Sequence, residues 1–191
     1  MAAGNDQTTV RWWDISGQHP GPPVEVGGIV GCLGVSPDST KLAVGEESGL
    51  VRIWDVATRS EEGRAQHGPI SVSSAAFSAD GKMLVSADEV GTIRFWELEN
   101  LRPIGMMRGN VEILSMIFFP DVRTLACGRQ DGTIQIVDAI TFQERMTWKA
   151  YDTYVVSLAV TPDGGTLVSG TLDAPFRIWR TAQAPKQSPG G

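Results

Sequence analysis

The stretch TTVRWWDIS, residues 8–16, decides the fold, because related stretches return at regular intervals through the 191-residue chain. These are LVRIWDVAT (50–58), TIRFWELEN (92–100), TIQIVDAIT (133–141) and PFRIWRTAQ (175–183). Their anchor positions are Trp13, Trp54, Trp96, Val137 and Trp179, with successive gaps of 41, 42, 41 and 42 residues. Such a regular period over the whole chain indicates a repeat architecture.

Each repeat predicts four short strands separated by turns. An apolar strand such as IVGCLGV leads through a turn such as SPDST to a second apolar strand such as KLAVG. The anchor-bearing strand follows a tight turn such as EESG, and a more polar fourth strand comes last. The inner strands are apolar at nearly every position, which predicts burial on both faces, and a polar outer strand suits an exposed edge. Four strands in about 42 residues are typical of a β-propeller blade.

The anchor stretches resemble the WD40-repeat family. Trp13-Asp14 and Trp54-Asp55 match its dipeptide, Trp96-Glu97 and Val137-Asp138 match half of it, and Trp179-Arg180 keeps only the tryptophan. We therefore expect an all-β, WD40-type β-propeller segment of about four four-stranded antiparallel blades, that is, a half-propeller. The expected boundaries are a partial blade at 1–17, repeats at about 18–58, 59–100, 101–141 and 142–182, and a flexible Pro/Gly-rich tail at 183–191. The propeller segment would thus cover residues 1–182.

The resemblance also implies a hydrogen-bond network inside each blade, which joins a His, a Ser or Thr, an Asp and the Trp indole. No repeat carries all four groups: Val90 occupies the Asp position before Trp96, and Tyr151 stands roughly where a His is expected before Trp179. Because the spacing of His67 and its neighbours matches such an internal network, we interpret them as structural rather than as a catalytic triad. The candidate network residues are His67, Ser86, Trp96, Asp131, Ser169, Asp173 and Trp179, with Trp13, Trp54 and Val137 as blade anchors.

Composition excludes several classes of function. The net charge is −6 and the Lys and Arg residues are scattered, which disfavours nucleic acid and acidic membranes as partners. No apolar stretch approaches a membrane span, and no apolar leader precedes the first repeat. Cys32 and Cys127 lie in apolar runs without metal-ligand spacing, so we expect free buried thiols, no metal, no cofactor and a cytoplasmic location.

No catalytic constellation is present, so we expect no enzyme: the chain has no phosphate-binding Gly loop, metal cluster or nucleophile elbow. What the resemblance implies is a rigid face that binds peptides or protein loops. We therefore predict a non-catalytic protein-interaction scaffold whose protein or peptide partner the sequence does not identify. Arg and Tyr are typical interface anchors, and the candidate contact residues in the loops are Arg108, Arg129, Tyr151 and Tyr154.

An alternative function is purely structural, because about four blades span only part of a ring. The chain could be the C-terminal part of a longer WD40-repeat protein, could pair with a second copy into a homodimeric ring of roughly eight blades, or could close as a small strained ring. The last repeat lacks a fourth strand, and the segment QHPGPPVEVGG (18–28) could supply one.

Overall fold

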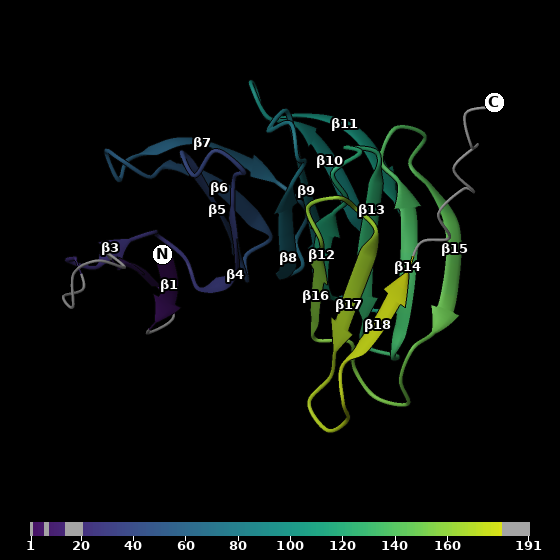
Figure 1. The fold of residues 1–191 in the computed structure, drawn as a ribbon. Coiled ribbons are helices and arrows are strands. Elements are labelled where there is room, and N and C mark those ends of the chain that lie inside the picture. The colour runs from purple at the N-terminus through teal and green to yellow at the C-terminus, as the bar shows by residue number, and fades with distance from the viewer. Residues whose placement is uncertain (1, 6–7, 14–20, 181–191) are drawn as a thin grey trace, which may run out of the picture.

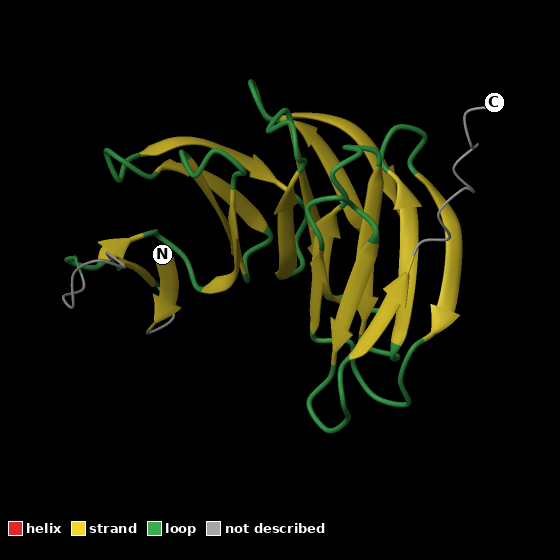
Figure 2. Ribbon diagram, viewed as in Figure 1, coloured by secondary structure: helices red, strands yellow, loops and turns green. Residues whose placement is uncertain are grey.

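The computed structural model describes residues 2–5, 8–13 and 21–180. Every regular element in this part of the chain is a β-strand (Figure 2). They form five antiparallel sheets, of which three have four strands and two have three. These sheets confirm the all-β, blade-like architecture predicted from the repeat. The predicted tail at 183–191 lies outside the described residues.

The strands are named in chain order and grouped here by sheet. Sheet 1 contains β1 (Ala2–Asn5), β2 (Thr9–Trp12) and β3 (Val24–Glu25). Sheet 2 contains β4 (Val30–Val35), β5 (Lys41–Glu46), β6 (Leu50–Asp55) and β7 (Glu61–Gln66). Sheet 3 contains β8 (Val72–Phe77), β9 (Met83–Asp88), β10 (Ile93–Glu97) and β11 (Arg102–Met107). Sheet 4 contains β12 (Ile113–Phe118), β13 (Thr124–Arg129), β14 (Thr133–Asp138) and β15 (Gln143–Lys149), and sheet 5 contains β16 (Ser157–Val160), β17 (Thr166–Gly170) and β18 (Arg177–Arg180).

The sheets follow one another in an open row, with sheet 1 at one end and sheet 5 at the other (Figure 1). Their first strands, β1, β4, β8, β12 and β16, are successive neighbours along this row. The segment suggested as an outer strand for the last blade instead belongs to sheet 1, because Val24 and Glu25 pair with Val10 and Thr9 of β2. The described row is therefore an arc of blades, and its two end sheets each have a face that no described sheet covers.

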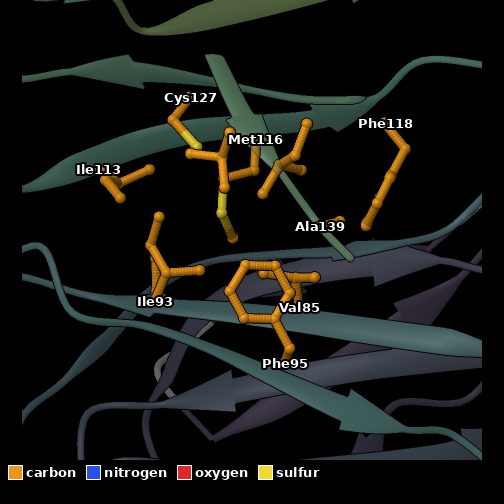
Figure 3. Packing of buried hydrophobic residues seen from close by; sticks show 11 residues of the cluster. Val85, Ile93, Phe95, Ile113, Met116, Phe118, Cys127 and Ala139 are labelled. Atoms are coloured by element: carbon orange, nitrogen blue, oxygen red, sulfur yellow. The ribbon is translucent and has the colours of Figure 1, made fainter. Parts of the chain in front are cut away.

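The core lies in the seams between neighbouring sheets. Side chains alternate along each strand, so one face of a sheet packs on the sheet before it and the other on the sheet after it. In the seam between sheets 3 and 4, Phe95 and Ile93 of β10 meet Met116 and Cys127 of sheet 4 (Figure 3). Full burial of a side chain such as Phe95 stabilises the fold by about 1.5–3 kcal/mol. Because both faces of the inner sheets are covered by neighbouring sheets, their second strands, such as β9 and β13, are almost entirely buried, whereas outer strands such as β7 are polar.

An aspartate holds each turn between the first and second strands of sheets 2 to 5. The Asp38 carboxylate accepts hydrogen bonds from Ser36 Oγ at 2.6 Å and Thr40 N at 3.0 Å. Asp80 and Asp163 accept equivalent bonds from Ser78 and Thr161. These side-chain hydrogen bonds hold the pKa of all three carboxyl groups below the ordinary value. The repeated aspartates therefore act in their own turns.

Candidate protein-contact surface

The network inside sheet 3 joins a loop to the blade. Trp96 Nε1 donates to Ser86 Oγ at 2.9 Å, and Ser86 Oγ lies 2.7 Å from Nδ1 of His67, which precedes the sheet. His67 Nε2 lies 3.3 Å from Oδ2 of Asp88, two residues before the position that the family pattern assigns to Asp. Burial lowers the pKa of His67 more than Asp88 raises it, so the ring is neutral near pH 7. All four groups are buried, so this set supports the loop from within and presents nothing to a substrate.

Sheet 5 replaces the histidine by a tyrosine. Trp179 Nε1 donates to Ser169 Oγ at 2.8 Å, and the Tyr151 hydroxyl donates to the Ser169 carbonyl at 2.6 Å. Tyr151 is only 4% exposed, so its assignment to a contact surface is wrong. Its ring is buried because it fills the place of the missing histidine. Asp173 is exposed and accepts from Thr171 Oγ at 3.3 Å, outside this network.

Sheet 4 has no such network among its described residues. Val137 and Cys127 occupy the positions of the tryptophan and the serine, and both are fully buried. Neither can link to Asp131, which instead accepts a bond from Thr133 N at 3.0 Å within its own turn. Asp131 is therefore a turn residue, because a valine anchor offers no indole N–H to satisfy.

Sheet 2 contains a buried ion pair that sequence reasoning missed. Arg52 Nε donates to Glu46 at 2.6 Å and its Nη1 donates to Glu61 at 2.7 Å. Glu46 is 2% exposed and packs against Gly28, where any Cβ would collide with its carboxylate. The signal was present in the sequence: Gly27-Gly28 replaces the Gly-His of the family pattern, which leaves room for a longer acidic side chain.

The first anchor differs from the others in burial. Trp13 is 41% exposed, whereas Trp54 and Trp96 are 8% and 3% exposed. The sequence predicts Trp13 as the anchor of the first blade, but its neighbour Trp12 is the residue that packs, in the cluster with Trp54. Trp13 directly follows β2 and, because side chains alternate, lies on the other side of sheet 1, which no sheet in the described part of the chain covers.

Interlocking loops form the end of the sheets where the predicted contact residues lie. Gly91, in the turn between β9 and β10, has a φ of 85° and sits so close to the Val111 carbonyl that no Cβ would fit. Gly132, in the turn between β13 and β14, lies equally close to the Tyr151 carbonyl in the seam between sheets 4 and 5. Gln130 Nε2 also donates to Glu112 at 2.9 Å, which joins the turn between β13 and β14 to the segment that connects sheets 3 and 4. These contacts hold the loops as one rigid surface.

Two of the four predicted contact residues lie open on this surface. Arg108 is exposed and Tyr154 is 46% exposed. The Arg129 side chain is only 13% exposed and lies 4.0 Å from Asp131, while Tyr151 is buried as described above. We define the loop-end surface as the exposed or half-exposed positions Glu89, Arg108, Glu112, Gln130 and Tyr154.

The two acidic residues of the loop-end surface, Glu89 and Glu112, lie close enough to interact. Burial and the neighbouring Glu89 carboxylate raise the pKa of Glu112 above its ordinary value. Glu47 occupies the same turn position in sheet 2 as Glu89 does in sheet 3, and both are exposed. Because two close carboxylates repel each other, a cationic group placed between Glu89 and Glu112 would be attracted by both.

The rest of the described chain offers no metal-binding group of three or more His, Cys, Asp or Glu side chains. It also contains no helix that could cross a membrane. Burial raises the pKa of both Cys32 and Cys127 to about 12, so these thiols are unreactive near pH 7.

Comparison with known proteins agrees with this geometry. The family model described as "WD domain, G-beta repeat" matches residues 23–55, 63–97, 101–138 and 142–180. The serine-threonine kinase receptor-associated protein of Gallus gallus is 28% identical over 95% of this chain and 51% of its own length. Target of rapamycin complex subunit LST8 of Bos taurus is 21% identical over 95% of this chain and 46% of its own length. Small ribosomal subunit protein RACK1y of Oryza sativa subsp. japonica is 29% identical over 81% of this chain and 48% of its own length, so the chain spans about half the length of these curated relatives.

Proposed function

Because this chain belongs to the WD40-repeat family, we propose that it is a non-catalytic protein-interaction module and that the loop-end surface contacts its partner. The observation that carries the proposal is the rigid, acidic loop end, where loops of neighbouring sheets are locked together and expose Arg108 and Tyr154. A pre-ordered surface loses little conformational entropy on binding. The names of the relatives, which mention a receptor, a protein complex and a ribosomal subunit, support an assembly role. We keep residues 1–182 as the proposed interaction domain.

The partner that fits this surface is a basic protein segment. A Lys or Arg side chain between Glu89 and Glu112 would satisfy both carboxylates, and the exposed Tyr154 of the same surface offers an aromatic face for a second cation. Electrostatic attraction of this kind raises the association rate and weakens with salt. Partner identity is set by the rest of the basic segment, which this surface alone does not specify.

The test combines affinity capture with charge reversal. Tagged wild-type chain and a Glu89→Lys/Glu112→Lys variant are used to capture proteins, and each captured protein is then titrated in purified form. We expect the double variant to lose the partner, and Glu99→Lys to retain it, because Glu99 lies exposed in the turn between β10 and β11, away from the loop end. Equal binding by all three proteins would refute the loop-end surface as the contact site.

A second proposal concerns assembly, and the outward face of sheet 5 carries it. Ile178, Val168 and Ala159 form a row across this sheet, as Ile136, Ala126 and Ile117 do across sheet 4. The row in sheet 4 packs under sheet 5, whereas Ile178 is 56% exposed and Phe176 beside it is 67% exposed. Since Trp13 is exposed at the other end of the arc, we propose that a second copy pairs these two kinds of face and completes a ring.

Sedimentation over a range of protein concentrations tests the pairing. We expect a dimer that dissociates when Ile178→Asp places a charge on the apolar row. A monomer at all concentrations would rule the second copy out, without affecting the loop-end proposal. We also propose a cytoplasmic location, which the two free thiols support because disulfides are rare there, and which imaging of a fluorescent fusion would check.

A further inference from the structure

Three seams of the arc are closed by the same device. One or two positions before each outer strand, a residue with a left-handed backbone places its side chain on a glycine of the preceding blade. Arg59, Leu101 and Phe142 have φ values of 56°, 53° and 56°. A Cβ on the facing glycine would lie 3.1 Å from Arg59 at Gly21, 3.0 Å from Leu101 at Gly63 and 2.6 Å from Phe142 at Gly105. We call these three side chains the wedges.

In two of these sheets an acidic residue follows the wedge by two positions and binds the strand beside it. In sheet 2 it is Glu61, which accepts from Arg52 Nη1 at 2.7 Å. In sheet 4 it is Glu144, which accepts from Gln135 Nε2 at 2.6 Å. Sheet 3 has Pro103 at this position. In these two sheets the outer strand therefore begins with a wedge and an acidic residue two positions later. The acid binds a polar side chain of the third strand.

The seam between sheets 4 and 5 lacks this closure in the described residues. Met146 of β15 is 54% exposed and pairs with Ile136 of β14. At the equivalent position, the outer strands of sheets 2 and 3 have Gly63 and Gly105, which pair with Ile53 and Phe95. A groove of about 750 Å³ opens beside it. Its apolar lining is formed by Phe119, Ile136, Met146, Trp148, Leu167 and Trp179.

The lining of this groove is distinctive. Trp148 and Trp179 meet edge to face, with ring centroids 5.3 Å apart, which makes an aromatic wall. The groove of about 680 Å³ between sheets 2 and 3 is instead lined by Leu98 and Leu101 and by charged side chains such as Glu62 and Lys82. The groove at sheets 4 and 5 therefore offers an apolar floor that no described wedge occupies.

The edge of β18 next to this groove is also open. Strand β18 pairs with β17 on one side and with no described strand on the other. Arg177 stands at the position of Arg52 and Gln135, and it has no ion pair with a described residue; its guanidinium lies 4.9 Å from the centre of the Tyr151 ring. Arg145 lines the groove but is already bound to Asp138 at 2.7 Å, and Arg180 lines it at the end of β18. Arg177 stands where Arg52 and Gln135 bind the acid of an outer strand, so it is the cation that we expect the acid of an added strand to meet.

The chain's own continuation does not match the wedge pattern. By the repeat spacing, the wedge position of sheet 5 falls on Ala184 and the acidic position on Lys186, both outside the described residues. Alanine is too small to cover the apolar floor. A lysine opposite Arg177 would repel it, since like charges on paired strands are destabilising.

We propose that the groove between sheets 4 and 5 binds an extended segment of a partner protein, with a Phe or Leu in the wedge position and a Glu or Asp two residues later. The segment adds as an antiparallel strand to β18, so that main-chain hydrogen bonds supply affinity and the two side chains supply specificity. The apolar side chain enters the groove beside Trp148 and Trp179, and the flexible Met146 side chain moves aside to admit it. The acid binds Arg177.

The test uses a peptide copied from the chain's own pattern, ITFQERMTWK, which is residues 140–149. The labelled peptide is titrated with the full chain and followed by fluorescence anisotropy. We expect saturable binding that falls at least tenfold when the Phe is replaced by Ala. We also expect a loss of about tenfold for Arg177→Glu, which a peptide with Lys in place of Glu restores, because one charged pair contributes about that factor.

Controls separate this site from the loop-end surface. Arg102→Glu makes the same charge change on an exposed side chain of β11 and should bind the peptide normally. The Glu89→Lys/Glu112→Lys variant should also bind it normally, so the two proposals fail independently. No saturable binding, no effect of the Phe or Arg177 changes, or equal competition by a peptide of residues 181–191 would overturn the proposal.

Discussion

Ser86→Ala tests whether the network in sheet 3 stabilises the blade as its geometry indicates. The Ser86 hydroxyl is the shared partner of the Trp96 indole and the His67 ring, at 2.9 and 2.7 Å. Alanine removes both hydrogen bonds and leaves two ring nitrogens buried, since the two residues are 3% and 1% exposed. Losing a bond and stranding a buried polar atom costs about 1–3 kcal/mol per atom, so we expect a total of about 3 kcal/mol.

The matched control is Ser169→Ala at the same repeat position in sheet 5. There the Tyr151 hydroxyl keeps its 2.6 Å bond to the Ser169 carbonyl, and Trp179 is only half-buried. The control should therefore cost about 1 kcal/mol. Urea denaturation gives both values, and in a chain of this size 3 kcal/mol corresponds to a fall in Tm of roughly 6–12 °C.

The result that would refute this reasoning is a loss for Ser86→Ala no larger than that for Ser169→Ala. It would mean that relaxation or water satisfies the two rings in sheet 3. A double-mutant cycle of Ser86→Ala with His67→Gln adds a second check, because a shared hydrogen bond requires a coupling energy of at least about 0.5 kcal/mol.

Three further predictions concern pH, charge and packing. Burial lowers the pKa of His67 in the folded state, so the unfolded chain binds a proton below about pH 6.5 that the folded chain does not. The Tm should therefore fall from pH 7 to pH 5, and His67→Gln, but not His19→Gln, should reduce this dependence of Tm on pH. Arg52→Met strands the buried Glu46 charge and should cost about 3–5 kcal/mol in urea denaturation, with part of the loss recovered by adding Glu46→Gln. Gly105→Val collides with the Phe142 ring and should cost about 1–3 kcal/mol, whereas Gly68→Ala, which meets nothing within 4 Å, should be close to neutral by the same assay.

The blades share one backbone plan but stabilise it by different side-chain chemistry. Sheet 3 uses a His–Ser–Trp network, sheet 5 replaces the histidine by Tyr151, sheet 4 is apolar at Cys127 and Val137, and sheet 2 uses the Glu46–Arg52 ion pair. Each solution satisfies the buried polar groups that its own substitutions create. Loss of the family pattern in one repeat is therefore compensated locally, because each blade contacts only its neighbours.

Local residue identity was enough to predict the strands and turns. Val10, Trp54 and Phe95 lie in strands because apolar residues recur with the strand period and aspartate turns separate them. Side-chain roles that depend on a residue distant in the sequence were harder to predict. Tyr151 was assigned to the surface because it lies in a loop, but its hydroxyl reaches Ser169, 18 residues away. Glu46 was missed as a buried charge because its partner Arg52 and the cavity at Gly28 meet only across strands.

The sequence by itself determined the repeat, its four-strand unit and the positions of the anchors, because strand periodicity and turn chemistry act over a few residues. Only the tertiary structure decided which anchors are buried: Trp54 lies under sheet 1, while the equivalent Trp13 lies on a face that no described sheet covers. It also decided that Arg59, Leu101 and Phe142 close three seams and that a groove remains at the fourth. The physical reason is that burial and seam packing depend on the neighbouring sheet, which a single repeat does not encode.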